Sequence, residues 1–571
     1  AADAESVVEA TDAGREGELI FRYIYDRCGC KLPVRRLWIS SLTPGAIKKG
    51  FAGLADGAQY ESLAAAARGR SQADWLVGMN LSRAYTLGSG EDELFSVGRV
   101  QTPTLSMLVD REIAIREFVP EKYTEVVATF QPHGSEATYP GTWFKGKGKG
   151  KSPTRLPPDG EQAAVIMGQA TRGRASIEEV KGEKKHHKPP LLYDLTELQR
   201  HANRIYGLSA DGTLKLAQAL YEKHKLISYP RTDSRHLSAD VAATLGQVVA
   251  AMSAPYRELL APGTGDKPLG KRFVDDQRVT DHHAIIPTAA SIQGKNLSRD
   301  EKLIYDLVCR RLLAAWHPDH VTATTTVITR IDPPEGETWM PHRYRSSGTS
   351  VEVDGWKVME PLAVVRRKEK GQQKKAEQLL PGGLARGQTA RVLNVEQRPA
   401  ETRPPRPFTE GTLLTAMETA GKTLEDKELS DAMRERGLGT PATRASIIET
   451  LLQRKYIERQ KKNLRATARG ERLIQQVHEE VKSPAMTGQW EHRLKLIEQG
   501  KDELDGFMAD IEAYVKRVVG TALQKGGGAN RATRVREGGP APARTTATAT
   551  STSRSTSTAT LVKRAPRSMA E

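Results

Sequence analysis

Helix-patterned and strand-patterned stretches alternate along most of this 571-residue chain, and this alternation limits the fold to a mixed, multidomain one. Residues 6–11 and 34–40 are apolar, strand-like runs, and a helical pattern follows each of them. In the second pattern, Thr43 stands where a helix N-cap is expected and Pro44 at the first helical position. The chain therefore begins as a β-α-β-α piece of an α/β layer.

Further along, each stretch is long enough to form a region of its own. The length suggests about four domains. The predicted helical regions are 55–115, 194–260 and 404–522, and the predicted strand-rich regions are 120–180 and 321–400. The sequence KGEKKHHKPP, at 181–190, is expected to be a linker.

The formal net charge of +16 favours a polyanionic partner such as nucleic acid. A solvated basic tail would account for part of the same excess. Beyond the glycines at 526–528 the chain is rich in Thr, Ser and Ala with scattered Arg, so it cannot bury a core. We expect that tail to be disordered.

Cysteine content and hydropathy exclude several classes of protein. Cys28, Cys30 and Cys309 are too few for a disulfide framework or a four-cysteine zinc site, and they indicate a reducing, intracellular setting. No apolar run approaches the ~20 residues needed to span a bilayer. The chain does not begin with Met and opens as if inside an element, so we expect its natural N-terminus upstream.

The stretch TDAGREGE, residues 11–18, places Asp12 after a strand and Glu16 and Glu18 in the first turn of a helix. Acidic residues there are stabilised by the helix dipole, which is a sufficient structural explanation. They are equally suited to hold a hard cation such as Mg²⁺ beside a phosphate. Both interpretations remain open at this point.

The stretch KGKGKGKS, at 145–152, only superficially resembles a phosphate-binding loop. Lys145 stands where that loop requires glycine, and Pro153 follows where its helix should begin. We reject this interpretation, and no nucleotide-hydrolysis motif is left in the chain.

Two more stretches carry groups suited to phosphate. SVGRVQTPT, at 96–104, combines Arg99 and Gln101 with hydroxyl residues, although a loop leading into a proline-started helix competes as an explanation. DHHAIIPT, at 281–288, holds His282 and His283. Adjacent histidines point to different faces, so one of them is a candidate proton carrier rather than both being ligands of one metal.

LISYPRTDS, at 226–234, is either a turn with an aromatic that covers a small core or the site of a nucleophile. An unperturbed phenol has a pKa of about 10 and needs assistance to attack a phosphate. Arg231 would stabilise both the phenolate of Tyr229 and the phosphate, and Asp233 would orient that arginine. The motif alone does not decide between the two.

These stretches occur together in a fixed order: TDAGREGELI, DWLVGMNLSRAYT, SVGRVQTPTL, PPLLYDLTELQRHAN, LISYPRTDSRHL, DHHAIIPT, PFTEGTLLTAME and GTPATRASIIETL. The series closely resembles bacterial DNA topoisomerase III, a group of type IA topoisomerases, from residue 1 to about 522. The resemblance implies that Tyr229 attacks a DNA phosphate and stays joined to the 5′ end. It implies an ATP-independent enzyme that cuts one strand, passes another and reseals, relaxing negative supercoils and decatenating DNA.

The resemblance also implies roles for other residues. Asp12 and Glu16 would belong to the acidic Mg²⁺ site of a TOPRIM fold, and Glu16 would also be catalytic. Arg231 would stabilise the scissile phosphate. His282 would assist the reaction in the active site. The loop that would grip single-stranded DNA comprises Ser96, Val97, Gly98, Arg99, Val100 and Gln101. Gln72 and Asn80 are further expected DNA contacts.

The implied architecture is a toroid that the chain enters and leaves repeatedly. The expected segments are a partial TOPRIM domain at 1–40, a first part of a helical base at 41–118 and a first part of a β-rich arch at 119–190. A helical domain with the tyrosine follows at 191–320. The chain then returns to the arch at 321–403 and to the base at 404–522, and ends in a basic tail at 523–571.

Two departures from the family pattern bear on the metal site. Many relatives carry a second aspartate where this chain has Gly14. The family's first TOPRIM strand, with a glutamate and a lysine used in cleavage and religation, would lie upstream of residue 1. A catalytically impaired fragment that binds single-stranded DNA is therefore the alternative expectation, and a trapped covalent adduct discriminates the two.

The implied partners are single-stranded and negatively supercoiled DNA, with a RecQ-like helicase or a single-stranded-DNA-binding protein as a further candidate. The implied protein is a monomer without membrane contact, in the cytoplasm and associated with the nucleoid.

Overall fold

A computed structural model describes residues 4–89, 94–146, 153–361, 380–423, 426–434 and 437–530. The chain opens as the predicted α/β layer. Strands β1 (Val7–Glu9), β2 (Val34–Arg36) and β3 (Ala55–Asp56) form one sheet in that order, with β1 and β2 parallel. Helix α1 (Arg15–Arg27) connects β1 to β2, and α2 (Pro44–Ala52) follows β2. Thr43 caps α2 by accepting a hydrogen bond from the Ala46 backbone N–H, as predicted.

Long helices join this layer to the C-terminal helical region. Helices α3 (Glu61–Ser89) and α4 (Gln101–Arg116) pack against α12 (Glu410–Glu418), α13 (Lys427–Arg434), α14 (Pro441–Gln453), α15 (Ala468–Gln476), α16 (Glu479–Lys482), α17 (Pro484–Glu498) and α18 (Leu504–Asn530) around a shared apolar core. A short hairpin, β10 (Ile457–Gln460) and β11 (Asn463–Ala466), lies within this region and was not predicted.

The β-rich stretches close into one barrel although they come from distant parts of the chain. Its strand order is β4-β5-β8-β7-β6-β9, and α5 (Glu161–Arg172) packs on it. The strands are β4 (Lys122–Pro132), β5 (Tyr139–Phe144), β6 (Arg174–His187), β7 (His320–Asp332), β8 (His342–Val353) and β9 (Thr389–Glu401).

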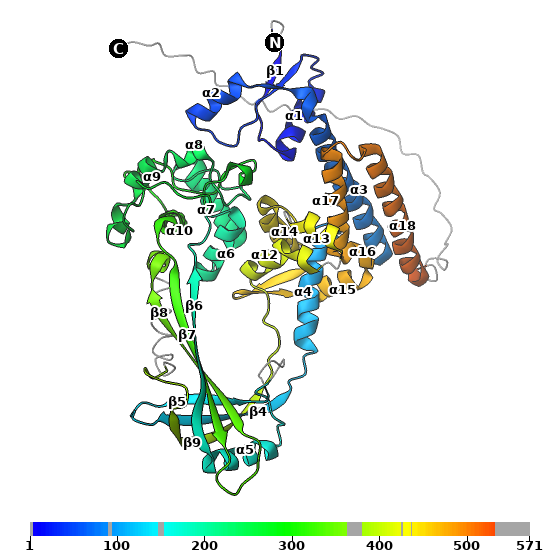
Figure 1. Cartoon of the computed structure of the whole chain (residues 1–571). Coiled ribbons are helices and arrows are strands. Elements are labelled where there is room, and N and C mark those ends of the chain that lie inside the picture. Colours follow the sequence, from blue (N-terminus) through cyan, green and yellow to red (C-terminus); the bar gives the residue numbers. More distant parts are fainter. Residues whose placement is uncertain are drawn as a thin grey trace, which may run out of the picture.

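A third core holds the segment with Tyr229. It is built on α6 (Leu195–Tyr206), α7 (Ala210–Glu222), α8 (Ala239–Ala242), α9 (Leu245–Met252) and α10 (Arg299–Leu313). Figure 1 shows these helices between the α/β layer and the barrel, so that the four groups of elements follow one another around a ring. Below, the group of α6–α10 is called the tyrosine domain, and the group of α3, α4 and α12–α18 is called the base.

The structure corrects two local predictions. The expected linker at 181–190 is wrong for most of its length, because β6 continues to His187 and pairs with β7 from Lys181↔Thr326 to His187↔His320. Cross-strand hydrogen bonds therefore override a composition that is typical of a loop. The expected tail also begins too early, since α18 continues to Asn530, and extending an existing helix costs far less than starting one.

Other predictions fall on residues that the structure does not describe. The rejected phosphate loop lies mostly within 147–152, and the tail beyond residue 530 lies outside the described residues. Within the part that is described, no helix combines the length and the apolar character that crossing a membrane requires.

Candidate active site

Tyr229 lies in the loop that follows α7, and a second segment holds that loop in place. The Ser228 backbone N–H donates to the Ile286 carbonyl at 2.9 Å, and the Ser228 hydroxyl donates to the Ala284 carbonyl at 3.1 Å. The Thr232 hydroxyl donates to the His282 carbonyl at 2.9 Å. The YPR and DHH motifs, which are distant in the sequence, therefore form one structural unit.

Aromatic rings surround the phenol of Tyr229. The centroid of the His282 ring lies 4.4 Å away, and the Tyr221 ring lies edge-on at 5.4 Å. Burial and the negative charge of Asp12 raise the pKa of Tyr229 above its ordinary value, while the nearby Arg231 opposes that shift. The phenol is accordingly protonated at neutral pH until a phosphate and further positive charge approach it.

Arg231 is exposed and is held from behind by α7. With its side-chain amide oriented to satisfy both groups, Gln218 accepts from Arg231 Nε at 3.3 Å and from Nη2 at 3.0 Å. Asp233 instead accepts a hydrogen bond from the Thr280 hydroxyl. The expected role of Asp233 in orienting Arg231 is thus filled by Gln218, and the guanidinium stays open to an incoming anion.

His282 reaches from the tyrosine domain to the acidic loop of the α/β layer. Its Nε2 lies 3.4 Å from Asp12 Oδ2, although the geometry is not that of a full hydrogen bond. This polar contact with His282 holds the pKa of Asp12 below its ordinary value, and partial burial opposes the effect. Asp12 is therefore ionised at neutral pH, beside the phenol that is expected to attack.

Arg36, at the end of β2, organises the acidic loop from beneath. Its fully buried guanidinium donates to the Thr11 carbonyl at 2.9 Å and to the Asp12 carbonyl at 2.7 Å. It also pairs with the buried Glu9 and Glu18, each at 3.4 Å. Burial and the nearby Glu18 raise the pKa of Glu9 to about 7. The sequence contains no signal for this role, because Arg36 is one basic residue among several in that stretch.

Glu16 is exposed at the start of α1 and lines a cleft of about 370 Å³ between the α/β layer, the tyrosine domain and the base. Other residues that line this cleft are Gly14, Trp38, Arg70, Arg231, Asp281, His282 and Thr440. The structure thus brings Glu16, Arg231 and His282 together around one cleft. Glu18 is instead fully buried and pairs with Arg22 and Arg36, so it has a structural role.

Thr440, Arg70 and Trp38 belong to the cleft and were not predicted as site residues. Thr440 is the N-cap of α14 and is followed by Pro441, so a helix N-terminus, which attracts anions, lies beside the cleft. That N-cap and proline pair was the one available signal. Nothing in the sequence marks Arg70 or Trp38.

The donor set of the cleft suits Mg²⁺ only in part. Among the described residues no three Asp, Glu, His or Cys side chains gather closely enough to hold a metal ion by themselves. Mg²⁺ is commonly held by one or two carboxylates together with water and a substrate phosphate. Glu16 lines the cleft, and Asp12 lies outside its lining, on the adjoining loop in contact with His282. The pair therefore fits a metal that is shared with DNA rather than enclosed by protein.

The loop at 96–101 is tied firmly to the base. The Ser96 backbone N–H donates to Tyr456 Oη at 2.7 Å, and Gln101 Nε2 donates to Ser96 Oγ at 2.8 Å. Val97 is buried, and the side chain of Val100 lies next to Gly439. Gly98 donates its N–H to the Thr102 hydroxyl at 3.1 Å.

Arg99 does not present its guanidinium to solvent. The residue is 3% exposed, and its guanidinium pairs with Asp74 at 2.8 Å and with Glu491 at 3.3 Å. Arg15 also pairs with Glu491, at 3.5 Å, so this glutamate on α17 links α1 with the loop. Arg99 therefore holds the loop in place in this conformation.

The two further expected DNA contacts lie on α3. Gln72 is exposed, and Asn80 is partly buried with its Nδ2 donating to the Leu76 carbonyl at 2.8 Å. Both lie on the helix that also carries Asp74, the partner of Arg99. Their contact with DNA stays a prediction.

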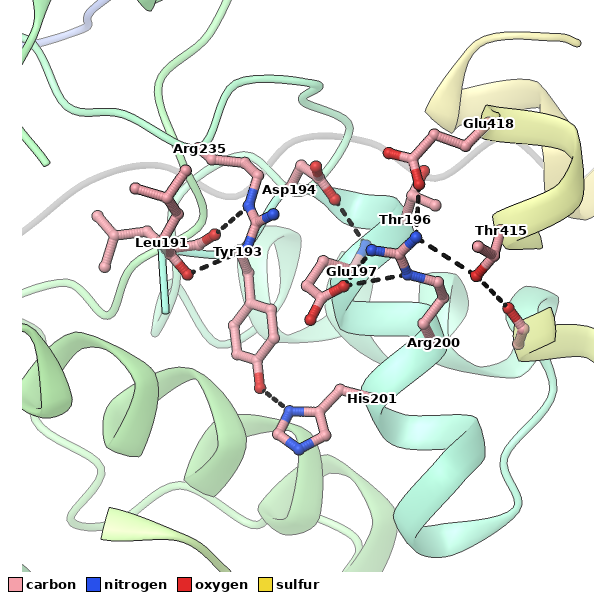
Figure 2. A network of polar contacts seen from close by, with 12 residues as sticks. Leu191, Tyr193, Asp194, Thr196, Glu197, Arg200, His201, Arg235, Thr415 and Glu418 are labelled. Carbon is pink, nitrogen blue, oxygen red and sulfur yellow. Dashed lines mark hydrogen bonds and ion pairs between the residues drawn. The ribbon is translucent and has the colours of Figure 1, made fainter. Parts of the chain in front are cut away.

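A polar interface joins the tyrosine domain to the base (Figure 2). Arg200 on α6 pairs with Glu197 and reaches Glu418 on α12 at 2.5 Å. Buried Arg444 donates to the Thr196 hydroxyl at 2.9 Å, and Glu410 accepts from the Ala210 backbone N–H at 2.7 Å. An interface of this polar kind costs less free energy to separate than an apolar core does.

Comparison with known proteins shows which family has this sequence. Residues 58–509 match the family model described as DNA topoisomerase. The chain is 40% identical over 523 residues to DNA topoisomerase 3 of Shouchella clausii and 39% identical over 523 residues to that of Bacillus subtilis. Each alignment covers 90% of this chain and 68% of the relative.

A solved structure shares the fold. The full-length topoisomerase I of Thermotoga maritima superposes with a TM-score of 0.63, covering 91% of this chain and 78% of that one at 24% sequence identity. At this identity the likeness concerns the fold alone, and it confirms the predicted toroid.

Proposed function

The chain belongs to the bacterial DNA topoisomerases of type IA, and from that premise we propose that Tyr229 is the residue that opens and reseals the DNA strand. The enzyme is an isomerase that acts on DNA. The observation that supports the assignment is the position of the phenol, which lies against His282 at 4.4 Å and beside the acidic loop that His282 contacts through Asp12. The alternative of a fragment that only binds DNA is not favoured by these relatives.

The proposed reaction is a transesterification that needs no ATP. The Tyr229 hydroxyl gives up its proton as its oxygen forms a bond to the scissile phosphorus, and the bond from phosphorus to the 3′ oxygen of the neighbouring nucleotide breaks. The leaving 3′ oxygen takes up a proton, and the 5′ phosphate stays joined to the tyrosine. Attack by the 3′ hydroxyl reverses these steps after another strand has passed, which changes the DNA topology.

The neighbouring side chains have distinct proposed roles. Arg231 binds the non-bridging phosphate oxygens and stabilises the charge that develops in the transition state. His282 orients the phenol through ring contact and holds Asp12. Glu16, on the other side of the cleft, is proposed to act near the leaving oxygen.

Asp12 and Glu16 are the proposed ligands for Mg²⁺, which the family generally requires. When bound, the ion would neutralise phosphate charge and orient the scissile group. Burial of Arg36 beneath the loop supports this assignment, because its bonds to the Thr11 and Asp12 carbonyls hold the loop in one conformation.

The proposed binding surface for single-stranded DNA consists of the loop at 96–101 together with Gln72 and Asn80. Ser96 and Gln101 would contact phosphates with hydroxyl, amide and backbone groups, while the buried Val97 and Arg99 would hold the loop, with Gly98 and Val100 shaping its path. We further propose that the protein acts as a monomer on negatively supercoiled DNA in the nucleoid. A RecQ-like helicase or a single-stranded-DNA-binding protein is the proposed partner.

Trapping the covalent intermediate tests the central assignment. The full chain is incubated with a 5′-labelled and a 3′-labelled single-stranded oligonucleotide and Mg²⁺, and the reaction is stopped with denaturant. We expect protein joined to the 5′ end of the downstream fragment, with the modified peptide containing Tyr229. An adduct on another residue, or its persistence in Tyr229→Phe, would show that Tyr229 is not the nucleophile.

A further inference from the structure

Arg444 of the base is buried against the tyrosine domain. The residue is 2% exposed, and its Nη1 atom donates to the hydroxyl of Thr196 at 2.9 Å. Its Nε atom donates to the Leu438 carbonyl at 3.4 Å, within the base. Thr196 is 1% exposed and lies in the first turn of α6. One guanidinium therefore joins the turn before α14 to the start of α6.

The segment that leads into α6 contacts both motifs of the active site. The Leu195 backbone N–H donates at 3.1 Å to the carbonyl of Thr232, the residue that follows the YPR motif. The Ile285 backbone N–H, from the stretch that carries the DHH motif, donates to the Tyr193 carbonyl at 2.8 Å. Thr196 follows this segment directly in the chain, so Arg444 binds next to the backbone that supports both motifs.

Opposite charges surround the guanidinium of Arg444. Burial lowers its pKa, and the negative charges of Glu418, Asp194 and Asp233 oppose that shift. An arginine stays protonated in proteins, so the bond to Thr196 is a charge-assisted hydrogen bond. Figure 2 shows Thr196 on the side of its segment that faces Glu418 of the base.

The helix that carries Arg444 also borders the active-site cleft. Thr440, the N-cap of α14, lines the cleft together with Arg231 and Asp233. Arg444 lies about one turn further along the same helix. Its bond to Thr196 therefore fixes the start of α14 relative to the segment that supports the YPR motif.

We propose that Arg444 is a positioning residue for cleavage, which aligns the loop of Tyr229 with the start of α14 through its hydrogen bond to Thr196. This inference rests on the proposed function of Tyr229 as the nucleophile. A displacement of a reacting group by about 1 Å lowers a rate by up to about a hundredfold, so one buried contact is enough to affect cleavage. The loop is then held in the geometry for cleavage only while the tyrosine domain contacts the base.

Removing one hydroxyl tests this role without changing a reacting group. Thr196→Val keeps the shape of the side chain and removes the acceptor for Arg444. The full chain with Mg²⁺ is mixed with a saturating labelled single-stranded oligonucleotide, and formation of the covalent adduct is followed over a single turnover. We expect the rate to fall by roughly tenfold or more, because misalignment slows the chemical step. The Kd for the oligonucleotide, measured without Mg²⁺, should stay within about twofold of the wild type, because this contact is not a binding contact.

A conservative variant and two matched controls separate alignment from general loosening. Thr196→Ser retains the hydroxyl and should cleave within about twofold of the wild-type rate. Thr415→Val removes a hydroxyl that contacts Arg200 at 3.4 Å across the same interface. Thr213→Val removes a buried hydroxyl that bonds to the Ser209 carbonyl at 2.9 Å within the tyrosine domain. Both controls should also cleave within about twofold of the wild-type rate, because these hydroxyls bond elsewhere.

Each other outcome contradicts the proposal. A wild-type cleavage rate in Thr196→Val would refute the role of Arg444. An equal loss in Thr415→Val or Thr213→Val, or a loss that Thr196→Ser shares, would show general weakening of the fold or of the interface instead of misalignment. If circular dichroism shows that Thr196→Val does not fold, Arg444→Lys gives the same comparison, since it keeps the charge and loses the geometry of the guanidinium.

The test distinguishes this inference from the function on which it rests. Failure of the wild type to form a Tyr229 adduct would refute the proposed function. A wild-type adduct on Tyr229 together with unaltered rates in the Thr196→Val and Arg444→Lys variants would refute only the positioning role.

Discussion

The ring of Tyr229 lies 4.4 Å from the ring of His282, and the Nε2 atom of that histidine lies 3.4 Å from Asp12 on the opposite side of an interface. The His282 side chain therefore lies between Tyr229 and the acidic loop and contacts both. Because the segment of His282 also binds the loop of Tyr229, any movement of the tyrosine domain away from the α/β layer carries both rings away from Asp12 together.

The first prediction concerns Arg231. Arg231→Ala should lower the rate of single-strand cleavage by about 10²–10³, the usual effect of removing one donor that stabilises transition-state charge. Single-turnover cleavage of a labelled oligonucleotide measures this. The exposed Arg257 on the same domain is the control, and Arg257→Ala should cleave at the wild-type rate. Similar losses in both variants would indicate general weakening of DNA binding.

The second prediction concerns Gly17 in α1. A Cβ there would lie 2.2 Å from the Asp12 carbonyl oxygen, which also accepts from Arg36, so neither the helix nor the loop has room to yield. Gly17→Ala should destabilise the fold by about 1–3 kcal/mol and lower the Tm. Gly520→Ala in the exposed part of α18 meets nothing within 4 Å and should stabilise by about 0.5–1 kcal/mol. Thermal unfolding followed by circular dichroism compares the two, and an unchanged Tm in Gly17→Ala would contradict the structure.

The third prediction is a pH dependence that arises from Glu9. Burial raises its pKa from 4.5 to about 7, so between these values the folded protein holds a proton that the unfolded chain releases. The stability contributed by protonated Glu9 is complete below pH 4.5 and is lost as the pH rises through about 7. Glu9→Gln should remove this pH-dependent loss of stability. The difference between the Tm of the wild type and the Tm of the variant should therefore fall as the pH rises from 4.5 to about 7. Glu5→Gln, at an exposed site, should leave a constant difference.

The fourth prediction separates a residue that holds the loop from one that contacts DNA. Arg99→Ala leaves Asp74 and Glu491 without their central partner and should destabilise the protein by about 3–5 kcal/mol. Arg83 is exposed on α3, the helix that carries the expected DNA contacts Gln72 and Asn80, so we expect it to contact a phosphate as well. Arg83→Ala should keep the Tm and reduce the slope of log affinity against log salt by about 0.7. Thermal melts and salt titrations of oligonucleotide binding measure both effects. A lowered slope in Arg99→Ala with an unchanged Tm would mean that Arg99 contacts DNA directly.

Much of this protein follows from local sequence pattern. The β-α-β-α opening, the Thr43 cap and the alternation of helical and strand-rich regions are confirmed, because each depends on residues a few positions apart. The residue types at the site, a tyrosine beside an arginine and acidic residues at the start of a helix, can be read from short stretches of sequence for the same reason. Their roles in the reaction stay predictions that the experiments above address.

Tertiary structure alone decided which of these groups meet. Residues 181–187 became a strand because β7 lies alongside them, and Arg99 turned inward because Asp74 and Glu491 converge on it from α3 and α17. The contact of Arg444 with Thr196 depends on how two domains pack, and no short-range pattern encodes it. The periodicity of a helix or strand depends on residues only a few positions apart. Contacts between residues distant in the sequence form only when the chain between them is closed into a long loop. Local sequence patterns therefore do not reveal those contacts.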